Sequence, residues 1–248
     1  MLRGSLREKT SLPMKRHLGP HRIGEKPLIA GVLTDIDVVS VSPDRLAPVD
    51  VIELRVDMFN SLDPGHIADI FTRARELFGK PLLATVRHTS EGGQRSIDDR
   101  VSLYRVVAPL SEAVDVEIFS EETMRSVSTL VADTPTVLIG SYHNFEATPD
   151  EDFLERVIGK GRQLGADIVK VAVMARSRED VVRLLLLAAR HRGQGIIALS
   201  MGDEGLVSRV VGPLFGSLLT YGYISQPSAP GQMSAAELSD ILGRLKIR

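Results

Sequence analysis

Apolar and polar positions fall into two alternating textures along this chain after about residue 26. Short runs rich in β-branched residues recur, and longer stretches with helical spacing separate them. The short runs cover residues 28–34, 51–56, 82–87, 113–118, 136–143, 167–173, 195–201 and 217–222. Because strands that alternate with helices form βα units, the pattern predicts an α/β domain with a parallel sheet.

The intervening stretches carry helix-start signals. Asp63, Thr148, Ser177 and Ser234 each stand where a side chain can cap the first turn of a helix. Ser234 is followed three residues later by a glutamate, which completes a capping box. These signals predict helices after the second, fifth, sixth and eighth strands.

Two arrangements satisfy eight parallel strands: a closed barrel and an open doubly wound sheet. No GxGxxG follows the first strand and no GxxxxGK[ST] occurs, which weakens the nucleotide-binding open sheet. A barrel gathers the carboxyl ends of all its strands on the face where barrel enzymes keep their active sites. Polar or sulfur-containing side chains stand near such ends at Glu53, Arg55, Arg87, His143, Lys170 and Met201. These observations favour a single (β/α)8 TIM barrel over the open sheet.

The composition narrows the class of protein. The 248 residues fit one barrel, and a formal charge of −2 with 4% aromatic residues favours neither nucleic acid nor membrane as a partner. Cysteine is absent, which excludes disulfides and thiolate chemistry and suits a cytoplasmic protein. The histidines form no HExxH motif, so we expect no metal.

Residues 1–26 differ from the rest, with seven basic residues against two acidic ones. No long apolar segment follows, so a secretory signal peptide is not expected; a mitochondrial presequence is harder to exclude on charge alone. We interpret residues 1–20 as a basic N-terminal extension and residues 21–248 as the catalytic barrel. The segment "HRIGEKP" is a candidate for a hairpin that closes the barrel bottom.

Lys170 lies in the middle of the apolar run "ADIVKVAVMA". A lysine in a strand can point outward and extend past a covering helix. The alternative is an amine kept neutral by apolar surroundings, since burial disfavours the ammonium form. A neutral amine adds to a ketone to give an imine, which acidifies the neighbouring C–H bond. His143, at the end of the preceding strand, could transfer that proton near neutral pH.

Other polar residues could anchor a small substrate. Glu53, Arg55 and Asp57 alternate along one strand, where they could also form only salt bridges at the barrel mouth. Arg87 and Arg209 follow strands, and arginine suits carboxylate recognition. Glu91 stands in a glycine-containing loop, and "SAPGQ" could offer its serine and glutamine to substrate hydroxyls as a lid.

Together these motifs resemble the type I 3-dehydroquinate dehydratases, the Schiff-base class of the shikimate pathway. The resemblance rests on "ELRVD", "TVRxxxEGG", "SYHNFxxTP", "DIVKVAV" and "SMGxxGxxSR…FGSxxTYG…SAPGQ", and covers nearly the whole chain after the extension. It implies a (β/α)8 barrel that forms a homodimer, binds 3-dehydroquinate and uses no cofactor.

The resemblance also implies residue roles. Lys170 would form the imine, His143 would move the protons, Glu91 would orient His143, and Arg209 would hold the substrate carboxylate. The substrate-binding residues would be Glu53, Arg55, Arg87, Met201, Arg209, Tyr221, Ser228, Ala229 and Gln232. Tyr221 stands where family members often have phenylalanine.

One departure concerns the first strand, where members often place a serine that contacts substrate. Here "LIAGVLT" has Gly31 and Val32 near that place, and Thr34 is a candidate replacement. Two other functions remain open at this point. Another Schiff-base barrel, such as an aldolase, would keep the lysine but change the anchors. A non-catalytic descendant would have lost the lysine, histidine or arginine, and all three are present.

Overall fold

The computed structural model describes residue 15, residues 17–227 and residues 231–247. Within these residues eight parallel strands form one sheet in the order β10-β3-β4-β5-β6-β7-β8-β9. Their bounds are β3 Leu28–Leu33, β4 Val51–Arg55, β5 Leu82–Thr85, β6 Ala113–Glu117, β7 Val137–Asn144, β8 Ile168–Met174, β9 Ile196–Met201 and β10 Leu219–Tyr223. All eight predicted strand regions are confirmed.

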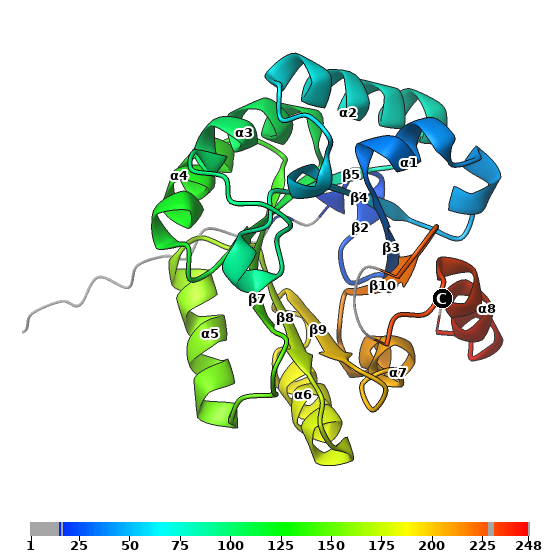
Figure 1. The fold of residues 1–248 in the computed structure, drawn as a ribbon. Helices are drawn as coiled ribbons and strands as arrows, with labels where there is room; N and C mark the ends of the chain where they lie inside the picture. The colour runs from blue at the N-terminus through cyan, green and yellow to red at the C-terminus, as the bar shows by residue number, and fades with distance from the viewer. Residues whose placement is uncertain (1–14, 16, 228–230, 248) are drawn as a thin grey trace, which may run out of the picture.

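The two end strands, β9 and β10, lie beside each other and bring the sheet close to a closed barrel. At this seam the backbone N–H of Leu218 donates to the carbonyl oxygen of Ile196 at 2.9 Å. The Ser217 hydroxyl accepts from the backbone N–H of Ala198 at 3.0 Å, so a side chain replaces part of the regular ladder. The architecture is a single (β/α)8 barrel, as predicted, and the ring of strands is surrounded by helices (Figure 1).

Eight α-helices alternate with the strands. They are α1 Asp35–Ser40, α2 Pro64–Phe78, α3 Arg100–Val107, α4 Glu121–Val131, α5 Glu151–Gln163, α6 Arg178–Arg190, α7 Ser208–Phe215 and α8 Ala235–Arg244 among the described residues. Asp63, Ser177 and Ser234 cap their helices as predicted. The cap of α5 is Asp150 rather than Thr148, because the Thr148 hydroxyl donates instead to the carbonyl oxygen of Met174.

Apolar side chains pack in two places. Those on the outer face of the strands form the core against the helices, and those on the inner face fill the lower part of the barrel. The inner group includes Leu28, Ala30, Val51, Leu83, Val137, Ile168 and Leu219. The upper part of the barrel, toward the carboxyl ends of the strands, is therefore left for polar side chains. None of the described helices is long and apolar enough to cross a membrane.

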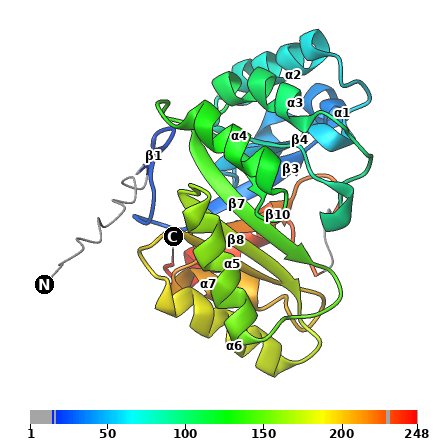
Figure 2. The same cartoon turned by 90° about the vertical axis from the view of Figure 1, so that its left-hand side faces the viewer.

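A short hairpin covers the bottom of the barrel. Strand β1, His17–Leu18, pairs antiparallel with β2, His21–Arg22, and Leu18 is fully buried among the inner apolar residues. Figure 2 shows β1 to one side of the barrel strands. The expected hairpin is present, and it begins before the boundary we placed at residue 20. Residues 1–14 and 16 lie outside the described residues.

Lys15 joins this hairpin to the barrel. Its ammonium donates to the carbonyl oxygens of Val131 and Thr136 at 2.7 and 2.5 Å, and its backbone N–H donates to Asp167 at 3.1 Å. Asp167 in turn accepts from the backbone N–H of Leu138 at 2.9 Å. The end of the basic segment is thus bound to the starts of β7 and β8.

The buried position of Leu18 leads to a stability prediction. Leu18→Ala should destabilise the protein by about 2–5 kcal/mol, because the barrel bottom loses a buried side chain and gains a cavity. Denaturant unfolding measures the change. Leu77→Ala, at an exposed position on α2, is the control and should stay within about 0.5 kcal/mol of the parent. Equal effects of the two substitutions would show that the hairpin does not contribute to the core.

Candidate active site

Lys170 points into the barrel and is 4% exposed. Its Nζ lies 3.0 Å from Oδ2 of Asp115 on β6, and 4.5 Å from the centre of the Tyr221 ring on β10. The outward-facing interpretation is therefore wrong. The expectation of apolar surroundings needs correction as well, because the amine is held by a carboxylate and an aromatic face.

Asp115 is the centre of a buried cluster of hydrogen bonds. Its Oδ1 lies 2.9 Å from Nη2 of Arg87 and accepts from the hydroxyl of Ser141 at 2.6 Å, while its Oδ2 accepts from Lys170. Burial on its own raises the pKa of Asp115, but the charges of Arg87 and Lys170 outweigh it and bring the pKa below its usual range. Asp115 is consequently ionised at neutral pH.

Arg87 connects this cluster to the next carboxylate. Its Nη1 donates to Glu117 at 3.1 Å and to Ser141 at 2.7 Å, and Arg100 also pairs with Glu117. Burial lowers the pKa of Arg87, yet the two carboxylates raise it overall well above its usual value. Both terminal nitrogens of Arg87 therefore contact the protein itself, and its clearest role is to hold Asp115 in place.

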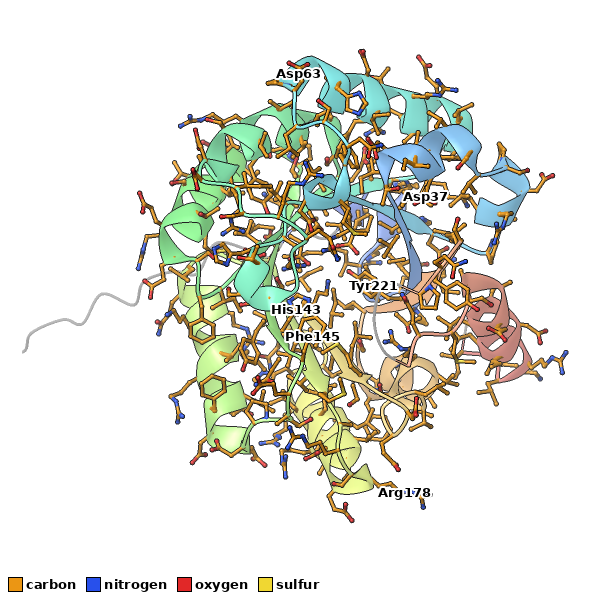
Figure 3. All side chains as sticks on the ribbon, in the orientation of Figure 1. Asp37, Asp63, His143, Phe145, Arg178 and Tyr221 are labelled. Carbon is orange, nitrogen blue, oxygen red and sulfur yellow. The ribbon has the colours of Figure 1, made fainter. Side chains whose placement is uncertain are left out.

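His143 lies on β7, the strand that pairs with β8, and Ser141 in the same strand is in register with Lys170. The His143 ring stacks on the Phe145 ring, and the two ring centres are 6.4 Å apart. Figure 3 shows His143 and Phe145 together near the middle of the ring of strands, with Tyr221 coming from β10. Burial lowers the pKa of His143 well below its usual value, and the charges of Arg87 and Lys170 lower it further. The imidazole is neutral at pH 7 and can accept a proton.

Glu91 fixes the orientation of the His143 ring. Its Oε2 accepts from the backbone N–H of His143 at 2.9 Å and lies 3.0 Å from Nδ1 of the ring. Burial raises the pKa of Glu91 to about 8, although Arg87 acts to lower it. Because Nδ1 faces Glu91, the other ring nitrogen, Nε2, remains for contact with a substrate.

Glycines set the shape of the loop that carries Glu91. The short helix η3, Thr89–Glu91, ends at Gly92, whose φ of 87° is unfavourable for other residues. A Cβ at Gly93 would lie 2.2 Å from the carbonyl oxygen of Arg87, which no side chain can tolerate. The "EGG" motif therefore has a physical basis, since it allows Glu91 to approach His143.

Glu53 and Arg55 lie on β4 and add two more charged side chains to the polar interior of the barrel. Glu53 is buried and accepts from the hydroxyl of Thr85 at 2.5 Å. Arg55 donates to both oxygens of Asp57 at 2.9 and 2.8 Å. Asp57 thus forms the expected salt bridge, and it also accepts from the backbone N–H of Arg87 at 3.2 Å.

Arg209 lies on α7 and is 2% exposed. Its Nε donates to the carbonyl oxygen of Gly231 at 2.8 Å, and its Nη1 donates to that of Tyr221 at 3.3 Å. Burial lowers the pKa of Arg209 to about 10, so the side chain stays positively charged at neutral pH. Its contacts place a buried cation beside the end of β10.

The remaining predicted site residues lie on β9, β10 and the loop that follows. Met201 and Tyr221 are buried, and Gln232 is half-buried. Ser228 and Ala229 lie outside the described residues. The hydroxyl of Thr34 is the cap of α1: it donates to Asp37 Oδ2 and accepts from the backbone N–H of Asp37.

Sequence reasoning missed Asp115, Glu117, Ser141 and Thr85. A signal for the first two exists in "AVDVEI", where two acids alternate with valines in a strand that should be buried on both faces. Such acids need buried cations as partners. Among the described residues no group of three or more His, Asp or Glu side chains could hold a metal ion. The arrangement instead combines a buried amine, a neutral imidazole and a buried guanidinium, which suits a ketone substrate with an anionic group.

Comparison with known proteins bears on this chemistry. A family model described as Type I 3-dehydroquinase matches residues 32–248. A 3-dehydroquinate dehydratase from Thermodesulfovibrio yellowstonii is 42% identical over 224 residues, which is 90% of this chain and 97% of the relative.

Solved structures agree with the family model. The type I 3-dehydroquinate dehydratase of Clostridium difficile, determined with covalent modified comenic acid, has a TM-score of 0.82 at 31% identity and covers 91% of this chain and 94% of its own. The 3-dehydroquinate dehydratase from Geobacillus kaustophilus has a TM-score of 0.83 at 29% identity. The match covers 90% of this chain and 93% of the Geobacillus chain. The chain belongs to the type I 3-dehydroquinase family and is a hydro-lyase that dehydrates 3-dehydroquinate.

Proposed function

We propose that the dehydration proceeds through an imine on Lys170, with His143 transferring the protons and Glu91 orienting His143. The observation that carries this proposal is the position of the Lys170 amine, buried in the barrel and held at 3.0 Å by Asp115. The pairing of β7 with β8 places His143 on the strand beside Lys170, two residues along from the position opposite the lysine. The covalent modified comenic acid in the Clostridium difficile relative is consistent with covalent chemistry in this family.

In the first stage, Nζ of Lys170 attacks the ketone carbon after losing a proton. Asp115 is a weak base because of its lowered pKa, so the neutral His143 takes that proton, directly or through a water that relays it. The carbinolamine then loses its oxygen as water and leaves a protonated imine. Asp115, with its negative charge beside the nitrogen, stabilises this cation as it stabilised the ammonium.

In the second stage, His143 removes a proton from the carbon next to the imine carbon, and the electrons form an enamine. The enamine expels the hydroxyl group one carbon further on, and His143 returns its proton so that water leaves. Hydrolysis of the conjugated imine releases 3-dehydroshikimate and regenerates Lys170. The buried and therefore neutral imidazole can act in both directions.

Substrate anchoring falls to the polar groups around the lysine. Arg209, a buried cation beside β10, binds the substrate carboxylate. Glu53 and Arg55 bind hydroxyl groups, Met201 and Tyr221 line the wall, and Ser228, Ala229 and Gln232 close the site from the loop after β10. Arg87 acts through Asp115. Lysine and histidine supply the chemistry, so the proposal needs no cofactor.

Assembly and location are also part of the proposal. We expect a cytoplasmic homodimer; the half-exposed apolar residues Val182, Leu186 and Leu214 on α6 and α7 support association, and the absence of cysteine suits a reducing compartment. The catalytic domain is residues 21–248, preceded by the basic extension of residues 1–20, whose last residues join the hairpin at the barrel bottom.

The imine can be trapped chemically. Borohydride added with 3-dehydroquinate should inactivate the enzyme, and mass spectrometry should find one ligand-derived adduct on Lys170, because reduction makes the C–N bond permanent. Lys170→Met should abolish both adduct and turnover while the circular dichroism spectrum is kept. Lys160→Ala is the control, since Lys160 lies on α5 and pairs with Glu121. An adduct on any residue other than Lys170 would refute the mechanism.

His143→Ala should reduce kcat by about 10²–10⁴-fold, the usual contribution of general acid–base catalysis, yet still give a borohydride-trapped adduct. Steady-state kinetics and mass spectrometry measure the two effects separately. His191→Ala, at the end of α6, should turn over normally. Should His143→Ala retain full turnover, the proton transfer must be assigned to another group.

Glu91 gives a pH-dependent prediction. Between pH 6.5 and 8 the folded protein keeps a proton on Glu91 that the unfolded chain has released, since the pKa is about 8 folded and 4.5 unfolded. Stability should therefore fall as pH rises, by up to about 1.4 kcal/mol per pH unit. Glu91→Gln has no such proton and should gain stability relative to the parent across this range in urea unfolding. A difference independent of pH would mean that Glu91 is already ionised at pH 6.5.

A further inference from the structure

The hydroxyl of Tyr221 is buried and has no hydrogen-bond partner among the described residues. Among the described residues, the only other buried side-chain nitrogen or oxygen without a hydrogen-bond partner is Oγ of Ser200, on β9. Tyr104 provides a contrast, since its buried hydroxyl donates to the carbonyl oxygen of Asp115 at 2.5 Å and accepts from the backbone N–H of Val86 at 3.3 Å. An unsatisfied buried hydroxyl costs free energy, which a hydrogen bond to a bound ligand or water would recover.

The position of Tyr221 indicates which ligand. The face of its ring lies 4.5 Å from Nζ of Lys170, within the range of a cation–π contact. Tyr221 is also in register with Ala30 on β3, a residue small enough to leave the ring room inside the barrel. The lysine amine is thus held from two sides, by the carboxylate of Asp115 and by this ring.

The hydroxyl can serve as a hydrogen-bond donor. Burial raises the pKa of Tyr221 well above its usual value, and the negative charges of Glu53 and Asp115 raise it further. The phenol therefore keeps its proton through the working pH of the site. Glu53 lies on β4, which only β3 separates from the β10 strand of Tyr221.

We propose that Tyr221 is a specificity-determining residue: its ring positions Lys170, and its hydroxyl donates a hydrogen bond to the substrate hydroxyl on the carbon next to the ketone. This inference rests on the proposed imine at Lys170. A ketone carbon bonded to Nζ brings its neighbouring carbon under the same ring, and 3-dehydroquinate carries a hydroxyl there. That oxygen would then lie between the phenol and Glu53.

Two opposite effects of one substitution follow from the proposal. Tyr221→Phe keeps the ring and removes the unsatisfied hydroxyl, so the free protein should unfold at a higher temperature. The same variant should lose about 3- to 10-fold in kcat/KM for 3-dehydroquinate, as expected for one neutral hydrogen bond. An analogue of 3-dehydroquinate that lacks the hydroxyl next to the ketone serves as a second substrate. Parent and variant should be equally active toward it.

The experiment compares the parent, Tyr221→Phe and Tyr221→Leu in thermal unfolding, in kcat/KM with both substrates, and in the rate of borohydride trapping. Tyr221→Phe should trap at the parental rate, whereas Tyr221→Leu, which loses the ring, should trap more slowly. Tyr104→Phe is the stability control and should lower the unfolding temperature, because its hydroxyl has partners.

Each outcome decides a separate point. Equal losses of Tyr221→Phe toward both substrates, or no loss toward either, would overturn the role of the hydroxyl. Parental trapping by Tyr221→Leu would overturn the role of the ring. Absence of trapping in the parent enzyme would instead refute the imine mechanism, so the two failures are distinguishable.

Discussion

The ionised side chain of Asp115 organises the interior of this barrel. It accepts hydrogen bonds from Lys170 on β8, from Ser141 on β7 and from Arg87, which follows β5. Two cations and one carboxylate could not be buried separately, because each isolated charge would carry a large desolvation cost. Together they satisfy one another, and their mutual contacts fix the position of the lysine amine more firmly than apolar packing could.

The same network sets the protonation of the groups around it. The charges of Arg87 and Lys170 help burial keep His143 neutral, while burial leaves Glu91 with a pKa of about 8. The proposed catalytic base, His143, is thus neutral at pH 7 because of its buried surroundings rather than because of a special local sequence. The pairing of β7 with β8 brings the imidazole and the amine close together, since it puts His143 and Lys170 on adjacent strands.

The barrel divides its interior between two tasks. Apolar residues fill the lower half and Leu18 of the hairpin closes it, which contributes stability. The upper half contains charged and polar groups, including the unsatisfied hydroxyl of Tyr221. The stable half can offset the cost of the polar half, which is a common arrangement in barrel enzymes because the active site always lies at the carboxyl ends of the strands.

The sequence by itself determined the eight strands, three of the helix caps and the family resemblance, and it named Lys170, His143 and Arg209 as site candidates, because these follow from local periodicity and motifs. It did not reveal the roles of Asp115, Glu117 and Ser141, nor that Arg87 contacts carboxylates and Thr34 caps a helix. Those facts depend on which side chains meet across strands far apart in the chain. Only the register of the nearly closed sheet decides such meetings, and through them the charge of each buried group.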